Sequence, residues 1–143
     1  MPRRYTVSFN GTLATASGDI DLLEVLPADD KPVRLLGITL GQISEVADAA
    51  EEGVRISVMR MPATVTSGSG GSAPTPVPVD SADAAAGFTA EVGNATVATT
   101  SGTALQFLEL GWNIRNSPFD YWFPEGLQVL ARQGEALIVR LQT

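Results

Sequence analysis

Short runs in which apolar and polar residues alternate recur along this chain, with turn-forming residues between them. The clearest are residues 5–9, where Tyr5, Val7 and Phe9 are the apolar members, and residues 54–58. Alternation with a period of two is the pattern of a β-strand with one buried face. Further strand-like runs occupy residues 20–26, 33–40, 95–100, 105–114, 127–131 and 136–141. The pattern predicts an all-β fold, a single antiparallel β-sandwich, because the strands of parallel sheets are continuously apolar.

Local features refine this prediction. Gly37 interrupts one of the apolar runs. The apolar phase shifts between Phe107 and Leu108, which indicates a β-bulge or a fully buried stretch. A turn at residues 133–134 favours a C-terminal hairpin, and Asn94 is interpreted as a turn residue.

Residues 66–79 form a long stretch rich in glycine, serine and proline. Such a composition is typical of linkers and of extended proline-rich chain. If this stretch separated two domains, each domain would have about half the length of the chain and would be small for an independent sandwich. We therefore expect one domain over residues 1–143 with a long loop at 66–79. Loops of this length are usually functional or disordered, and we expect a neighbouring subunit to hold this one in place.

Residues 43–52 are the segment with the strongest helical character. Ser44 is suited to cap a helix start, and Gly53 is suited to end it. Glu51 and Glu52 would face the negative end of the helix dipole, which is unfavourable. A short helix and an acidic loop are both open at this point.

The side-chain inventory excludes several classes of function. The chain has no cysteine, no histidine and a single lysine, Lys31. Disulfides, cysteine-based zinc sites, thiol catalysis, histidine-assisted nucleophiles and a Walker phosphate loop are thereby excluded. The net charge of −7 disfavours binding to nucleic acid, and no apolar run is long enough to span a membrane. We expect no cofactor.

Paired carboxylates are the acid–base groups that remain. Asp19 and Asp21 share one strand face in this pattern, and further pairs are Asp29–Asp30, Glu51–Glu52 and Asp80/Asp83. A glycosidase requires two carboxyl groups about 5–10 Å apart, and calcium requires several oxygen ligands. Acids at strand ends and in turns are usually only solvated, and we favour that interpretation over a hydrolase or a calcium site.

Aromatic residues gather in the segment bracketed by Pro118 and Pro124, which we predict to be a loop or corner. Phe119, Tyr121 and Trp122 lie in it. Rings in such a place plug the end of a core, anchor a subunit interface or stack on a sugar, and all three interpretations remain open.

Several stretches resemble small structural proteins of tailed bacteriophages and prophages. They are residues 66–79, 85–88, 110–115 and 134–141, and with the acidic segment 48–52 they span most of the chain. The resemblance implies a jelly-roll-like sandwich and a place in the virion. The protein would be made in the host cytoplasm and would decorate the capsid surface. These motifs are structural, so the resemblance carries over no catalytic residue.

A decoration protein acts through contact surfaces, so we predict a non-enzymatic protein that binds the major capsid protein and copies of itself as a homotrimer. The interface candidates are the N-terminal Arg3 and Arg4, the loop residues Ser67, Gly70, Pro74, Pro76 and Pro78, and the corner residues Phe119, Tyr121 and Trp122. The alternative is a module on a head fibre or tail that binds a glycan or receptor.

Overall fold

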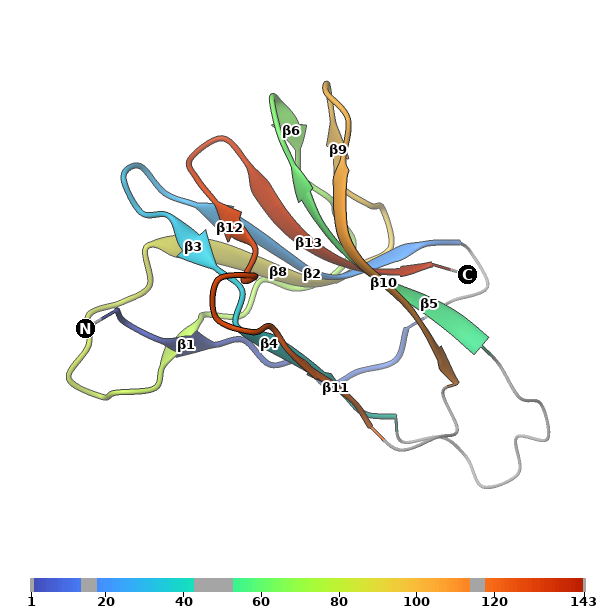
Figure 1. The fold of residues 1–143 in the computed structure, drawn as a ribbon, viewed down its shortest axis with the longest axis horizontal. Helices are drawn as coiled ribbons and strands as arrows, with labels where there is room; N and C mark the ends of the chain where they lie inside the picture. The colour runs from blue at the N-terminus through green and yellow to red at the C-terminus, as the bar shows by residue number, and fades with distance from the viewer. Residues whose placement is uncertain (1, 14–17, 43–52, 114–117, 143) are drawn as a thin grey trace.

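The computed structural model describes residues 2–13, 18–42, 53–113 and 118–142, which form strands and turns with no helix (Figure 1). The strands are β1 (Tyr5–Thr6), β2 (Ile20–Pro27), β3 (Val33–Arg34), β4 (Gly37–Leu40), β5 (Gly53–Met61), β6 (Val65–Thr66), β7 (Val77–Pro78), β8 (Phe88–Asn94), β9 (Thr99–Thr100), β10 (Leu105–Asn113), β11 (Phe119–Trp122), β12 (Leu130–Ala131) and β13 (Ala136–Gln142). The protein is therefore all-β, as the alternating runs predict.

A five-stranded antiparallel sheet is the body of the fold. Its strand order is β10–β5–β13–β2–β8, so the C-terminal strand β13 lies at the centre, between β5 and β2. The remaining strands form the antiparallel pairs β1–β7, β4–β11, β3–β12 and β6–β9. Successive residues of a strand point to opposite faces, and Val58 and Met59 accordingly belong to two different buried clusters.

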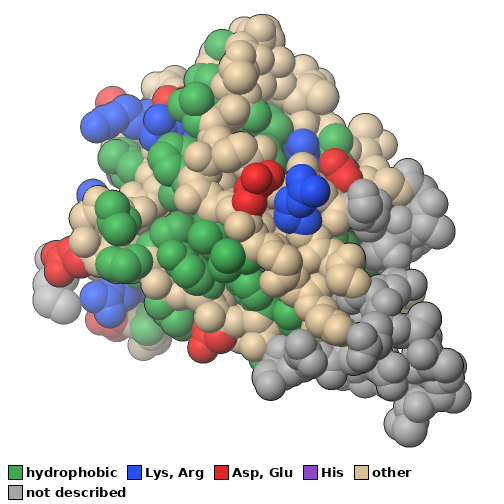
Figure 2. Space-filling view, turned by 45° about the vertical axis from the view of Figure 1, so that its right-hand side comes forward, with side chains coloured by type: hydrophobic (Ala, Val, Ile, Leu, Met, Phe, Trp, Pro, Cys, Tyr) green, Lys and Arg blue, Asp and Glu red, His purple; other side chains and the backbone are tan. Residues whose placement is uncertain are grey.

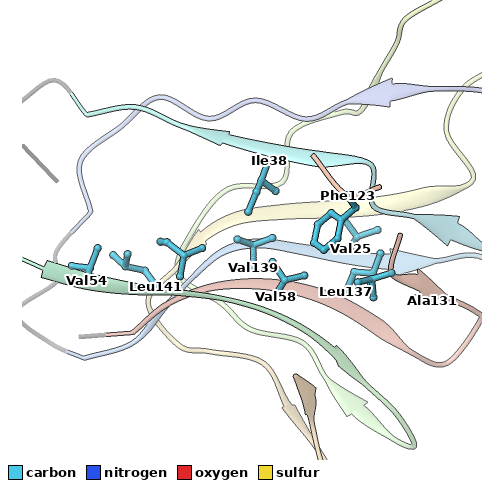
Figure 3. Packing of buried hydrophobic residues seen from close by; sticks show 11 residues of the cluster. Val25, Ile38, Val54, Val58, Phe123, Ala131, Leu137, Val139 and Leu141 are labelled. Atoms are coloured by element: carbon cyan, nitrogen blue, oxygen red, sulfur yellow. The ribbon is translucent and has the colours of Figure 1, made fainter. Parts of the chain in front are cut away.

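The first face of the sheet carries the larger core. Figure 3 shows Ile38 of β4 and Phe123, which follows β11, lying toward Val25 and Val139 of the sheet. The backbone N–H of Phe123 donates to the carbonyl of Leu36 at 2.8 Å, which fixes the ring over the sheet. The β4–β11 pair thus covers this face and buries it.

The second face is covered by chain that has little regular structure. Met59, Met61 and Ile138 project from β5 and β13 into a smaller buried cluster. Ala98 and Val65, from the segments around β9 and β6, pack against them. Both faces of the sheet are therefore buried along residues 56–59 of β5 and 136–139 of β13, whereas Arg55, near the start of β5, is exposed.

Several local predictions are confirmed. The run 20–26 is strand β2, and the run 33–40 contains β3 and β4. The break between them falls at residues 35–36, and Gly37, which interrupts the run in the sequence, is the first residue of β4. The register of β10 against β5 shifts between Gln106 and Leu108, where the apolar phase of the sequence changes. A β-bulge adds one residue to a strand, so the apolar residues that follow it shift by one position in the alternation.

Other predictions are wrong. The C-terminal hairpin does not form, because β12 pairs with β3 while β13 pairs with β2 and β5. The aromatic segment is not a loop: Phe119–Trp122 is strand β11, and Pro118 and Pro124 lie just outside its paired residues, where no ladder donor is lost. Of the run 5–9, only Tyr5–Thr6 is strand.

The edge strand β8 was missed altogether, and Asn94 is its last residue rather than a turn residue. The apolar residues at positions 88, 90 and 92 alternate with Thr89, Glu91 and Gly93, so the period-two signal of a strand was present in the sequence. The question of a helix or an acidic loop at 43–52 lies outside the described residues.

Candidate functional site

Asp21 and Arg140 form a buried ion pair on the second face of the sheet. The two residues are opposite each other in the β2–β13 ladder, so the strand register sets their separation. Arg140 Nε lies 2.6 Å from Asp21 Oδ1, and Asp21 is fully buried. The pair also ties down the segment above it: the N–H of Ala98 donates to Asp21 at 2.7 Å, and Arg140 donates to the carbonyl of Ala98 at 2.9 Å.

Glu24, three residues further along β2, is the second buried carboxylate. It accepts hydrogen bonds from the hydroxyl of Ser67 at 2.7 Å and from the N–H of Gly68 at 3.0 Å. The amide of Asn94 donates to it at 3.3 Å, and the side-chain oxygen of Asn94 accepts from the N–H of Gly71 at 3.1 Å. A carboxylate and a carboxamide thus hold the glycine- and serine-rich backbone by its donors.

The same segment also extends the sheet. Ser72 exchanges backbone hydrogen bonds of 2.8 and 3.0 Å with Val92 of the edge strand β8. Ser69 does the same with Thr96, at 2.9 and 3.0 Å. Residues 67–72 are therefore held by hydrogen bonds within the chain, so this part of the loop does not require the neighbouring subunit that was expected to hold it.

The interface candidates predicted from the sequence lie in separate places and do not form one patch. Arg3, Arg4 and Pro78 lie at or beside the β1–β7 pair; Ser67 and Gly70 lie in the segment over the second face, which continues through Pro74 to Pro76; and Phe119, Tyr121 and Trp122 lie in β11. Arg3 forms an ion pair with Asp83 (3.7 Å), and the carbonyl of Arg4 accepts from the N–H of Val79. Val79 itself is 65% exposed.

The aromatic residues of β11 divide between core and surface. Phe119 and Tyr121 are half-buried against the first core cluster, and their ring centroids lie 6.4 Å from Trp112 and 5.0 Å from Phe123, respectively. Trp122, on the opposite side of the strand, is 65% exposed. The segment is thus part core plug and part exposed surface, two of the interpretations left open by the sequence.

The paired acids outside the core serve local structure. Asp80 accepts from the N–H of Ala82 at 2.9 Å, and Asp83 pairs with Arg3. Asp29 and Asp30 are exposed in a turn. In the part of the chain that the structure describes, no group of three or more acidic, cysteine or histidine side chains is placed to hold a metal ion.

The edge strand β10 presents apolar side chains to the surface. Leu105, Phe107 and Leu110 are 42%, 45% and 37% exposed. An open hollow beside this strand is lined by Asp19, Gly53, Val54, Arg55, Glu109, Leu110, Gly111 and Gln142. Figure 2 shows hydrophobic side chains gathered into a continuous area on one side of the molecule, next to oppositely charged groups. An exposed apolar area of this kind is typical of a contact surface.

No family model, no curated protein and no solved structure matches this chain. Within the described residues, no helix has the length and apolar character needed to cross a membrane. Its function is therefore argued from its own surface and buried groups.

The buried acids Asp21 and Glu24, with their partners Arg140 and Ser67, form a buried anchor that holds the covering segments. The sequence analysis missed this anchor, although one signal for it was present. Asp21 and Glu24 interrupt an otherwise apolar strand, and a charge inside a buried strand requires a partner. What the sequence does not show is which of the scattered arginines, glycines and serines supplies that partner, since Arg140 and Ser67 are far from β2 along the chain.

Proposed function

We propose that this chain is a non-enzymatic structural protein of a bacteriophage particle, a jelly-roll-like β-sandwich that decorates the capsid through contacts with the shell and with copies of itself. The observation that carries the proposal is the set of large apolar side chains left on the surface. They are Phe9, Val77, Val79, Leu105, Phe107, Leu110, Trp122 and Leu127, each at least 37% exposed. Exposed apolar surface of this extent marks a site that a partner covers, and in a particle the shell and neighbouring copies would be that partner.

The use of the buried acids also supports this proposal. Asp21 and Glu24 are the buried acids of the described residues. Asp21 binds Arg140 and accepts from the N–H of Ala98, and Glu24 accepts from the hydroxyl of Ser67 and the N–H of Gly68. Both acids lie under these covering segments rather than in an open hollow, so a substrate would have to displace them. A role through contact fits this arrangement better than acid–base hydrolysis.

Binding to capsids tests the proposal directly. Capsids purified from the phage or induced prophage that encodes the chain are mixed with purified protein and sedimented. We expect the protein to sediment with the capsids and Trp122→Ala to weaken that binding, because the exposed ring is the largest apolar group on the outer side of β11. The control is Thr89→Ala, a change at an exposed polar position of β8.

The same experiment separates the alternative function. A glycan-binding module would also use an exposed ring, and the exposed Trp122 is the observation that favours it. However, Trp122 does not line the hollow beside β10 or the hollow near Gly134, so its ring does not border a groove at either place. Failure to sediment with capsids, together with glycan binding that Trp122→Ala abolishes, would replace the shell proposal with this one.

A further inference from the structure

The two edges of the five-stranded sheet differ in how much of their backbone is hydrogen-bonded within the described residues. On β8, the segment containing Ser72 adds backbone hydrogen bonds to Val92 and covers part of the edge. On β10, the described residues supply backbone pairing from β5 alone, so the opposite side of Leu105–Gly111 faces outward. A long apolar edge of this kind is a template for another strand, and proteins usually cover or charge it.

The sequence of β10 is complementary to itself in one antiparallel register. If a two-fold axis passes beside Leu110, this residue lies opposite its own copy on the apolar face. Glu109 then lies opposite Gly111 of the second copy on the other face, because antiparallel partners point to the same side. A register shifted by one residue on each strand would place Glu109 opposite Glu109, and like charges directly opposite each other are destabilising.

The charged groups around Gly111 favour this register. Gly111 pairs with Arg55 in the β5–β10 ladder, and a Cβ at Gly111 would find no atom within 4 Å. The open hollow beside Gly111 is bordered by Arg55 and Gln142, and also by two acids of the same chain, Asp19 and Glu109. Glu109 of a second copy would enter this hollow from across the edge.

Arg55 is within reach of that carboxylate. Two strand spacings separate their backbones by about 10 Å, which an arginine and a glutamate side chain span together when the residue between them is glycine. Within one chain, Arg55 Nη1 already lies 3.9 Å from Glu109 Oε1, with the two side chains 60% and 47% exposed. In the pair, each Arg55 would lie between two Glu109 carboxylates, and the two copies would contribute equal numbers of each charge.

We propose that the β10 edge is a homodimer interface, in which the strand pairs with β10 of a second copy about a two-fold axis at Leu110, with Glu109 beside Arg55 of the other copy. The inference rests on the self-contact part of the proposed function and specifies it. A two-fold pair takes the place of the homotrimer expected from the sequence, since a three-fold axis cannot set a strand against itself.

Exchange of charges between two variants tests this pairing. The mass of the full chain in solution is measured by sedimentation equilibrium over a range of concentrations. We expect the wild type to reach the mass of two chains. Arg55→Glu and Glu109→Arg should each raise the dimer dissociation constant by about tenfold, because each places like charges across the axis. Mixing the two variants should restore a dimer, since one then supplies both positive groups and the other both negative groups.

The mixture is the decisive measurement, because an ion pair within one chain cannot be restored by adding a second variant. Arg34→Glu, the same charge reversal at an exposed position of β3, is the matched control and should leave the dissociation constant unchanged. Leu110→Arg should give monomers at every concentration, with an unfolding transition like that of the wild type.

Several results would overturn the pairing: a wild-type monomer or trimer, a dimer that Leu110→Arg leaves intact, or a mixture no tighter than the separate variants. Capsid binding is scored separately. A dimer that ignores capsids would overturn the shell proposal alone, and a monomer that binds capsids would overturn this inference alone.

Discussion

Asp21 connects three parts of the chain through one side chain. Its carboxylate lies at 0% exposure, paired with Arg140 of the C-terminal strand and with the backbone of Ala98. A buried ion pair contributes little net stability compared with an apolar replacement, but loss of one partner leaves an uncompensated charge in the interior. The register of β2 against β13 and the position of the covering segment therefore both depend on this residue.

We predict that Asp21→Asn lowers the free energy of unfolding by about 3 kcal/mol or more, because the guanidinium of Arg140 is left without its charge partner. Denaturant unfolding followed by fluorescence measures this change. Arg3→Ala is the control: it removes an ion pair whose side chains are 54% and 26% exposed, and should cost less than about 1 kcal/mol. Equal losses in the two variants would show that the buried pair has no special structural role.

At the scale of elements, the glycine- and serine-rich segment lies against the edge of the sheet and pairs with β8 at one isolated bridge, Ser72 with Val92. Gly71 lies so close to β8 that a Cβ at this position would meet the carbonyl oxygen of Val92 at 2.0 Å. The composition of the segment suggests a flexible linker, but glycine is required here because the backbone approaches β8 so closely. The backbone N–H groups of Gly68 and Gly71 donate to Glu24 and Asn94.

We predict that Gly71→Ala destabilises the protein by about 1–3 kcal/mol, because the added methyl group forces the segment away from β8. Gly41→Ala is the matched control, since a Cβ there meets nothing within 4 Å. The free energy of unfolding of both variants is compared with that of the wild type. If Gly71→Ala proves as mild as Gly41→Ala, the segment does not lie against β8 in solution.

For the whole molecule, the main core joins the five-stranded sheet to the β4–β11 pair. Phe123 carries much of this contact: it is 7% exposed, and its ring meets Tyr121 edge-on at 5.0 Å. The neighbouring surface residue Leu127 is 70% exposed. The two side chains are four residues apart, yet Phe123 belongs to the buried core and Leu127 to the exposed surface.

We predict that Phe123→Ala costs about 3–5 kcal/mol, whereas Leu127→Ala changes the free energy of unfolding by less than about 0.5 kcal/mol. Thermal and denaturant unfolding of the two variants check this difference. A small effect of Phe123→Ala would mean that the β4–β11 pair does not cover the sheet as described.

The sequence by itself determined the all-β class and the place of β2, and it indicated a bulge or a fully buried stretch in β10, because these features depend on local periodicity. It did not determine that β12 leaves β13 for β3, or that the segment between Pro118 and Pro124 is strand β11. Those pairings depend on which partner edge is open once the sheet has formed.

The buried anchor and the proposed dimer edge follow the same rule. The sequence shows acids at 21 and 24 and an apolar strand at 105–113, but the partners of those acids come from distant segments. Only the tertiary structure decides that Arg140 and Ser67 satisfy them, and that β8 receives a covering segment while the described part of β10 does not. Charge pairing and edge protection depend on spatial neighbours, which local sequence does not specify.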